Sequence, residues 1–430
     1  MQYYAVEARL WHLVFWAGIV AWSWLRDGGS LGYSALFAAI FFNNLAIEVG
    51  VTLRLDYVLC ASLALAAVPR VAGRRFPPEV WVLGLLLSAL LVSSTVAAAS
   101  PSFSVRKLGI VAIYVVASAM VVAPAAAQTS TMDLLRRFLR VANRVLLVSL
   151  VGYLVQVGVG LDLGLIKETD AAWLRGPMIN ANLFGSTAAA VGVLCLAVAL
   201  FADPAPRRTY LLWWGVAAAC VFLSYTRAAW LVFGLASAAV WIWSAFSRRA
   251  LGVPHLVALG GAVVLGLGIG QLAAMLNFEQ KLGSVFAVSS GTGLDRVVVA
   301  QAGLRDWLES PVLGKGFEAW EYAHGTDQDP TAFVQMVLFV QLLEYGGAVT
   351  FGLFGLFLVM LHWRGFKVMR RSGGAWSGDV VVPLLLVLDA MIVAYQATSG
   401  LQLAFFWFLA MFAVYVIEER MAAPPDAARA

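Results

Sequence analysis

Charged residues are scarce in this chain. Of its 430 residues, 12% are Asp, Glu, Lys or Arg and 62% are hydrophobic. A soluble domain carries about twice that charged fraction, so the composition excludes an ordinary soluble protein. Apolar runs of roughly 17–25 residues recur from end to end, each long enough to cross a bilayer. They are continuous rather than alternating, which favours membrane-spanning α-helices over a transmembrane barrel.

Cysteine is scarcer still. The three cysteines, Cys60, Cys195 and Cys220, each lie within an apolar run. That position favours small core residues over a disulfide framework, and no metal-ligand spacing accompanies them. We therefore expect no metal and no other cofactor. Basic stripes with interleaved aromatic residues are also lacking, so no nucleic-acid partner is expected.

The apolar runs predict an all-α polytopic transmembrane bundle of about 12–13 spans that forms one integral membrane domain over residues 1–430. With the usual uncertainty of a few residues at each end, the runs cover roughly 10–25, 31–50, 55–70, 79–98, 106–127, 144–160, 180–202, 209–225, 228–246, 255–275, 334–361, 380–397 and 401–417. If all thirteen cross the membrane, the N-terminus is outside. If one of the first two is interfacial, both ends are inside.

Basic clusters alternate with cation-poor loops along the chain. Because cytoplasmic loops carry an excess of Lys and Arg, the clusters predict the cytoplasmic side. They lie at 70–75, 136–144, 207–208, 248–249 and 364–371. The loops at 99–105, 161–179, 224–227 and 276–333 are then expected to be external.

The loop at 276–333 is the one large external segment that the sequence predicts. Its apolar residues at helical spacing predict a helix over 294–308, with Thr292 or Gly293 at its start. Ser310-Pro311 should end that helix, because the residue before proline disfavours the helical conformation. Gly314 and Gly316 then predict a turn. A polar, acidic stretch follows, with Glu318, Glu321, His324, Asp327 and Asp329.

Four arginines fall on the predicted external side: Arg175, Arg227, Arg296 and Arg305. Cations are normally depleted there, so their presence indicates a bound anion, and a diphosphate suits paired guanidinium groups. Arg227 sits alone in a tight turn between two runs. The plainer interpretation is that its side chain snorkels to the headgroup region. Arg296 and Arg305 are nine residues apart and point to opposite sides of their helix, so at most one can face a common site. Each also flanks an aspartate, Asp295 or Asp306, with which it could form a surface ion pair.

Two asparagines, Asn180 and Asn182, follow Arg175 at the start of an apolar run. Either could cap that helix, which is the structural interpretation. A helix N-terminus also presents free N–H groups to a phosphate, and Arg175 would add a formal charge.

Several residues are candidates for a proton acceptor. His324 is the one histidine in a predicted external loop, and Glu321 lies three residues before it. Glu344 and Asp389 lie within apolar runs, where each is either functional or the structural partner of an arginine.

These motifs together resemble the O-antigen ligase and polymerase superfamily of bacterial envelope glycosyltransferases. Arg175-Gly176-Pro177 before Asn180 resembles the family's arginine-glycine start of a central span, and Thr226-Arg227-Ala228 resembles its arginine turn. Arg296 followed by Pro311-Val312-Leu313-Gly314-Lys315-Gly316 resembles its arginine helix and glycine turn. Glu344-Tyr345-Gly346 resembles its glutamate-x-glycine. The four motifs cover about residues 170–360.

The resemblance implies metal-independent, inverting transfer of a glycan from an undecaprenyl-diphosphate carrier to an acceptor sugar hydroxyl, at the periplasmic face of the inner membrane. It implies that Arg175, Arg227 and Arg296 contact the diphosphate. Asn180, Asn182 and Arg305 are further candidates for diphosphate binding. His324, Glu321 and Glu344 are the candidate catalytic residues. His324 stands upstream of the family's usual histidine, so Glu318, Glu321 and Glu344 stay open as the base.

A polymerase of O-antigen or exopolysaccharide is the first expectation, with a chain-length regulator and membrane lipids as further partners. The alternative in the same family is an O-antigen ligase, which uses lipid A–core as acceptor in lipopolysaccharide biosynthesis. A flippase for lipid-linked polysaccharide would show internal repeats with broken helices in matching halves, and we find no such repeat. A small-anion transporter could use Arg227 but would not need the loop at 276–333.

Overall fold

The computed structural model describes most of the chain after residue 75. The described residues are 41, 46–48, 52–54, 56–57, 60–61, 64–65, 68, 73, 75–128, 131–160, 163, 165–167, 173–178, 180–201, 207–248, 292–318, 337–371, 380–395 and 404–422. Ten helices lie within them: α4 (Pro78–Val96), α5 (Pro101–Gln128), α6 (Thr131–Val159), α7 (Ala181–Phe201), α8 (Arg207–Leu223), α9 (Arg227–Arg248), α12 (Thr292–Glu309), α14 (Leu338–Arg371), α15 (Val381–Ala394) and α16 (Ala404–Ala422). Two short hairpins, β1 (Ala46–Glu48) with β2 (Thr52–Arg54) and β3 (Ile166–Lys167) with β4 (Trp173–Leu174), accompany the helices.

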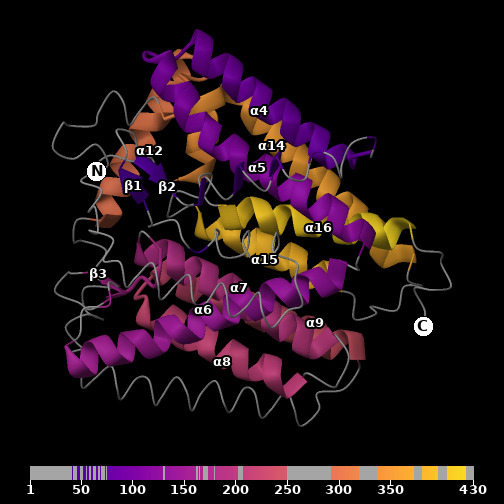
Figure 1. Ribbon diagram of the computed structural model, residues 1–430. Coiled ribbons are helices and arrows are strands. Elements are labelled where there is room, and N and C mark those ends of the chain that lie inside the picture. Colours follow the sequence, from indigo (N-terminus) through magenta and orange to yellow (C-terminus); the bar gives the residue numbers. More distant parts are fainter. Residues whose placement is uncertain are drawn as a thin grey trace.

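The expected all-α bundle is confirmed as a bundle of long apolar helices (Figure 1). Within the described part of the chain, five helices are long and apolar enough to cross a membrane by length and composition: Pro78–Val96, Pro101–Met120, Asp133–Val159, Ala181–Phe201 and Leu338–Arg371. The expected spans 10–25 and 255–275 lie outside the described residues, as does most of 31–50 and 55–70.

Two expectations about the first half of the chain are wrong. Residues 46–48, expected at the end of a span, form β1, which pairs antiparallel with β2 in the register Ala46↔Arg54. Branched residues such as Ile47 and Thr52 suit a strand as well as a span, and apolar periodicity alone does not separate the two. The basic cluster 136–144, expected in a loop, lies inside α6. There Leu135, Phe138 and their neighbours form a buried face, so the arginines occupy the polar face of one long helix.

Helix α7 is the centre of the lower half of the bundle, where it packs against α6, α8, α9 and α15 (Figure 1). It is buried along nearly its whole length. Its small residues allow this close packing, because helices in membranes approach best through Gly and Ala. A Cβ atom at Gly185 would lie 2.3 Å from the Ser224 hydroxyl, and one at Gly192 would lie 2.8 Å from the Ala217 side chain.

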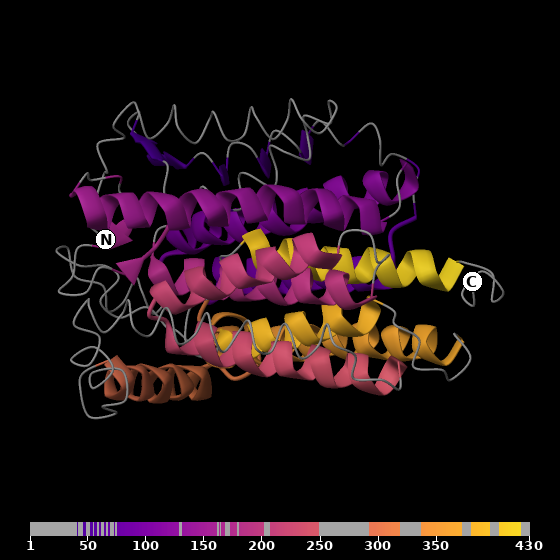
Figure 2. The ribbon, with the colours of Figure 1, turned by 90° about the horizontal axis from the view of Figure 1, so that it is seen from below.

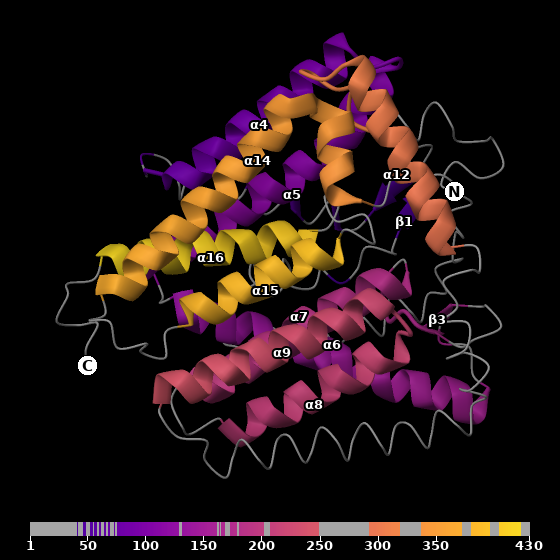
Figure 3. The same ribbon diagram turned by 180° about the vertical axis from the view of Figure 1, so that it is seen from behind.

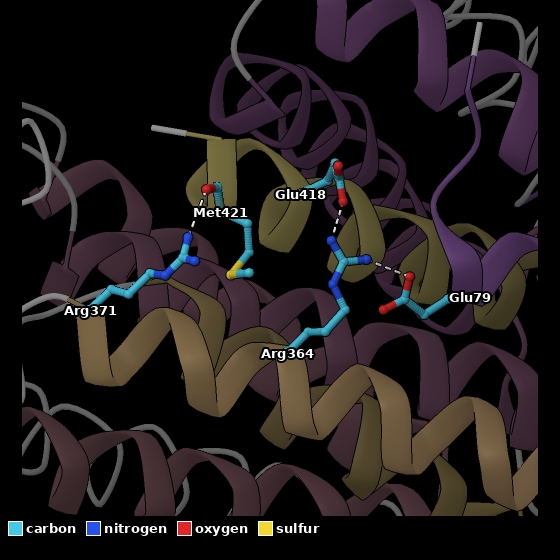
Figure 4. Close-up of polar contacts among 5 residues, drawn as sticks. All are labelled: Glu79, Arg364, Arg371, Glu418 and Met421. Atoms are coloured by element: carbon cyan, nitrogen blue, oxygen red, sulfur yellow. Dashed lines mark hydrogen bonds and ion pairs between the residues drawn. The ribbon is translucent and has the colours of Figure 1, made fainter. Parts of the chain in front are cut away.

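Helices α4, α5, α14 and α16 make up the other half, and α15 and α16 lie where the two halves meet (Figures 1 and 3). Arg364 of α14 joins three of these helices: its guanidinium donates to Glu79 of α4 at 2.6 Å and to Glu418 of α16 (Figure 4). Arg371 donates to the carbonyl oxygen of Met421 at 2.9 Å. Glu79 is fully buried, so loss of Arg364 would leave a buried carboxylate without its partner, a costly change.

The long helices lie side by side, so the bundle has two ends (Figure 2). We name one the basic end: it holds the starts of α4, α6 and α8 and the ends of α9, α14 and α16, and with them the described residues of the basic clusters. The other is the turn end, which holds the β3–β4 hairpin, the α8–α9 turn and α12 with the turn that follows it. All three cysteines are free and buried, as expected of core residues.

Candidate functional site

The segment that carries Arg175 leads from β4 into α7 at the turn end. The Arg175 N–H donates to the carbonyl oxygen of Leu165 at 2.9 Å, which extends the β3–β4 hairpin. Gly176 follows with a φ of 54°, and a Cβ atom there would lie 2.4 Å from the ring of Phe184. Glycine is therefore required at 176, and it brings the Arg175 backbone close against the first turn of α7.

The first predicted asparagine is a helix cap. The side-chain oxygen of Asn180 accepts the Leu183 N–H at 2.8 Å, the usual N-cap geometry, so the structural interpretation is confirmed for Asn180. Only the side-chain N–H groups of Asn180 could bind an anion, because its oxygen is an acceptor.

The second asparagine meets the turn between α8 and α9. The Thr226 hydroxyl lies 3.2 Å from the Asn182 side-chain oxygen and 3.2 Å from the carbonyl oxygen of Ala181. Tyr225 before it has a φ of 51°, and the Trp230 indole donates to the carbonyl oxygen of Val221 at 2.9 Å to close the turn. Two segments that are 44 residues apart in sequence are thus joined at one point.

Arg227 is the first residue of α9 and follows Thr226 directly. Its backbone therefore lies at the N-terminus of α9, next to the N-terminus of α7. The two helix ends present free N–H groups and positive dipole ends at the same place. The conformation of the Arg227 side chain lies outside the described residues.

Helix α12 confirms the helix expected over 294–308, and it ends at Glu309, directly before Ser310-Pro311. Arg305 is exposed on it. Its sequence neighbour Asp306 instead pairs with Lys315, whose ammonium group lies 2.8 Å from Asp306 and 2.7 Å from Glu309. The proposed surface pair between Arg305 and Asp306 is therefore wrong, because the chain turns back after Glu309 and presents Lys315 to these carboxylates. Burial lowers the pKa of Lys315, but the two hydrogen bonds outweigh it and hold that pKa above its usual value.

Three predicted residues lie wholly or partly outside the described part of the chain. Arg296 belongs to α12, but its side chain lies outside the described part of the chain, as do His324 and Glu321 altogether.

Helix α14 is broken near its start, at the turn end. Gly347 has φ 65° and ψ −165°, which interrupts the helical hydrogen bonds on both sides of it. The turn after α12 supplies the missing partners. The N–H groups of Lys315 and Gly316 donate to the carbonyl oxygens of Glu344 and Tyr345, at 2.7 and 3.1 Å.

On the C-terminal side of the break, the N–H groups of α14 donate to the turn. The Ala348 N–H donates to the carbonyl oxygen of Pro311 at 2.9 Å, and the Val349 N–H to that of Val312 at 3.4 Å. Non-helical backbone is tolerated at membrane depth where protein satisfies its polar groups, and the turn does this here.

The glycines of the two motifs make this contact possible. A Cβ atom at Gly347 would lie 2.2 Å from the carbonyl oxygen of Val312, and one at Gly314 would lie 2.5 Å from that of Glu344. Gly314 and Gly316 both have positive φ, as the predicted turn requires. The glycine turn and the glutamate-x-glycine, read from the sequence as separate motifs, are thus the two halves of one contact.

The two acids that the sequence places in apolar runs, Glu344 and Asp389, both lie in described helices. Glu344 is fully buried beside the break in α14. Asp389 of α15 lies 3.0 Å from Nε2 of His362, so its partner is a histidine rather than the arginine that we considered.

Sequence reasoning missed an ion pair at the end of the turn after α12. The Lys107 ammonium group lies 2.9 Å from a carboxylate oxygen of Glu318, which is 3% exposed and has a φ of 54°. Lys107 also stands 5.3 Å from the centre of the Phe103 ring. The signal was available, since Lys107 and Arg106 are cations beside a loop that the topology places outside.

Helix α4 also contacts the end of this turn, next to α14. The Phe317 N–H donates to the Ser94 hydroxyl at 3.1 Å, and the Ser93 hydroxyl donates to the carbonyl oxygen of Tyr345 at 2.6 Å. Helices α4, α5 and α14 therefore all contact the turn that follows α12. A residue other than glycine at positive φ is uncommon and is enriched at functional sites, so Glu318 belongs with the candidate site.

In the described part of the chain, no three His, Cys, Asp or Glu residues lie close enough together to hold a metal ion. Neither the models of known protein families nor the curated proteins give a match to this chain.

Proposed function

We propose that this protein is a membrane glycosyltransferase. It moves a glycan from an undecaprenyl-diphosphate carrier to an acceptor sugar hydroxyl, at the periplasmic face of the bacterial inner membrane, and acts as a polymerase of O-antigen or exopolysaccharide. One observation supports this most. The Thr226 hydroxyl contacts Asn182 and Ala181, so the segments that carry Arg175 and Arg227 meet at one end of an apolar bundle.

The reaction needs cationic groups that bind and stabilise the leaving diphosphate. The bond from C1 of the donor sugar to the diphosphate oxygen breaks, and the diphosphate gains negative charge as it leaves. Guanidinium groups and helix N-termini fixed in place stabilise that charge most in the transition state. Arg175, Arg227 and the N-termini of α7 and α9 would supply them. Helix α12 would add one further arginine, either Arg296 or the exposed Arg305, because the two point to opposite sides of the helix.

The acceptor hydroxyl must lose its proton as its oxygen bonds to C1. A direct displacement from the face opposite the leaving group inverts the configuration at C1. Four groups are candidates for the base, namely His324, Glu321, Glu318 and Glu344. Glu344 and Glu318 are both buried near the contact between the broken α14 and the turn, because the Glu344 carbonyl accepts the Lys315 N–H and Glu318 follows Lys315 by three residues. Glu321 and His324 come next in the sequence.

Analysis of the glycans of a deletion strain tests the proposal in the cell. We expect loss of polymer, with single repeat units attached to lipid A–core or accumulated on the carrier lipid. An accumulation of lipid-linked polymer that never reaches lipid A–core would instead identify a ligase. An unchanged set of glycans and carrier-linked intermediates would contradict transfer altogether.

A further inference from the structure

A stripe of four exposed residues lies on α14 at the basic end of the bundle. Trp363, Phe366, Lys367 and Arg370 stand at positions i, i+3, i+4 and i+7, so they share one face of the helix. Trp363 is 57% exposed and Phe366 is 45% exposed. We refer to these four residues as the α14 stripe.

Each cation of the stripe rests on an aromatic ring. The Lys367 ammonium group stands 5.4 Å from the centre of the Trp363 ring, and the Arg370 guanidinium stands 5.9 Å from that of Phe366. Contacts of this kind hold the side chains of the cations along the rings. The N–H groups that do not face a ring remain free to donate to a ligand from outside.

The other two arginines of this part of α14 are used within the protein. Arg364 binds Glu79 and Glu418, and Arg371 binds the carbonyl oxygen of Met421 (Figure 4). Among the described residues, no carboxylate forms an ion pair with Lys367 or Arg370. The charges of the stripe are thus the ones that the fold leaves uncompensated on this face.

Apolar residues continue the same face towards the middle of the helix. Val359 is 66% exposed and Leu356 is 46% exposed, one and two turns before Trp363. From Leu356 to Arg370 the face changes from aliphatic to aromatic to cationic over about 21 Å, at 1.5 Å per residue. A phospholipid has the same order of parts, with acyl chain, interfacial region and charged headgroup.

We propose that the α14 stripe binds the headgroup of an anionic phospholipid. Lys367 and Arg370 hold the phosphodiester, and Trp363 and Phe366 lie at the depth of the glycerol, where aromatic side chains are enriched. The acyl chains run along Val359 and Leu356. A zwitterionic headgroup fits less well, since its own cation competes with Lys367 and Arg370 for the phosphate.

Native mass spectrometry of the purified full chain tests this directly. Phosphatidylglycerol and phosphatidylcholine with the same acyl chains are offered in equal amounts, and the bound copies of each are counted. We expect the wild type to prefer phosphatidylglycerol. Lys367→Gln with Arg370→Gln should weaken phosphatidylglycerol binding about fivefold for each cation removed. Equal retention of the two lipids by the wild type would overturn the proposal.

A control variant distinguishes binding by the α14 stripe from a general effect of positive charge at the basic end. Arg75 and Arg208 are also exposed at the basic end, and within the described residues neither stands over an aromatic ring. Arg75→Gln with Arg208→Gln removes the same charge and should leave the preference unchanged. If this control loses as much phosphatidylglycerol as the stripe variant, the stripe has no special role and the proposal fails.

Competition with inorganic phosphate distinguishes a lipid site from a site for a free anion. Inorganic phosphate at constant ionic strength should not displace phosphatidylglycerol, because the acyl chains contribute to binding. Displacement would show a simple phosphate site and would contradict a lipid as the occupant. Trp363→Leu with Phe366→Leu keeps both charges and should still reduce the preference. An undiminished preference in that variant would remove the aromatic residues from the proposed site.

Discussion

The main-chain N–H of Lys315 donates to the carbonyl oxygen of Glu344 at 2.7 Å, and through this bond the turn after α12 enters the break in α14. A carbonyl group left free by a broken helix is costly to bury without a partner. The turn after α12 therefore stabilises the break in α14, and the break fixes the position of that turn.

Gly347→Ala should destabilise the protein by more than about 2 kcal/mol, because alanine is strained at a φ of 65° and its Cβ would meet the Val312 carbonyl. Gly352→Ala in the same helix is the matched control, since nothing lies within 4 Å of a Cβ atom there. It should be neutral or slightly stabilising. Thermal unfolding in detergent measures both. Equal melting temperatures for the two variants would show that the break is not needed.

Thr226→Val should reduce transfer more than it reduces stability. The loss of one hydrogen bond costs about 0.5–1.5 kcal/mol of stability, but the hydroxyl also fixes the turn that precedes Arg227. Thr226→Ser keeps the hydroxyl and should retain most of the activity. Turnover and melting temperature are compared for both variants. A fall in melting temperature with normal turnover in Thr226→Val would limit the residue to a structural role.

Lys107→Met should destabilise the protein by about 1–3 kcal/mol, because it removes the ammonium group that lies 2.9 Å from the buried Glu318. Adding Glu318→Gln should restore part of that loss, since the buried negative charge is removed as well. A double-mutant cycle on the free energy of unfolding measures the coupling between the two residues. Additive losses would mean that the two side chains act independently.

Topology can be checked with single cysteines in a background that lacks Cys60, Cys195 and Cys220. Ser102 and Gln301 are exposed near the turn end, and Asp133 and Thr209 are exposed near the basic end. An impermeant thiol reagent applied to intact spheroplasts should label cysteine at 102 and 301 but not at 133 and 209. The opposite pattern would reverse the orientation and place the arginine turns in the cytoplasm.

The sequence predicted the helices far better than their contacts. Long apolar runs and Ser310-Pro311 are local signals, and they predicted α7 and the end of α12 to within a few residues. The strand β1 was missed, and so was the first part of α6, of which only the run 144–160 was predicted. In each of these an apolar pattern fits two structures, and tertiary pairing or packing decides between them.

For the candidate site too, the sequence predicted local motifs but not the contacts between them. The glycine turn and the glutamate-x-glycine could be recognised as motifs, yet nothing local says that Lys315 bonds to the backbone of Glu344. The partner of Asp389 was also misjudged, because a position in sequence does not reveal which helix face a neighbour presents. Contacts between distant segments depend on the whole bundle, and no short stretch of sequence contains them.

The central claim is that Arg227 at the α8–α9 turn clamps a diphosphate during glycan transfer. Purified protein in proteoliposomes, given an undecaprenyl-diphosphate-linked glycan and an acceptor, measures this most directly as product formed per unit time. The account predicts that the wild type transfers the glycan. It predicts that Arg227→Lys, although folded, is slower by about 10²-fold or more, because a point charge does not replace a bidentate guanidinium. Near-normal transfer by Arg227→Lys would contradict the claim, since the residue would then do no more than place a positive charge at the membrane surface.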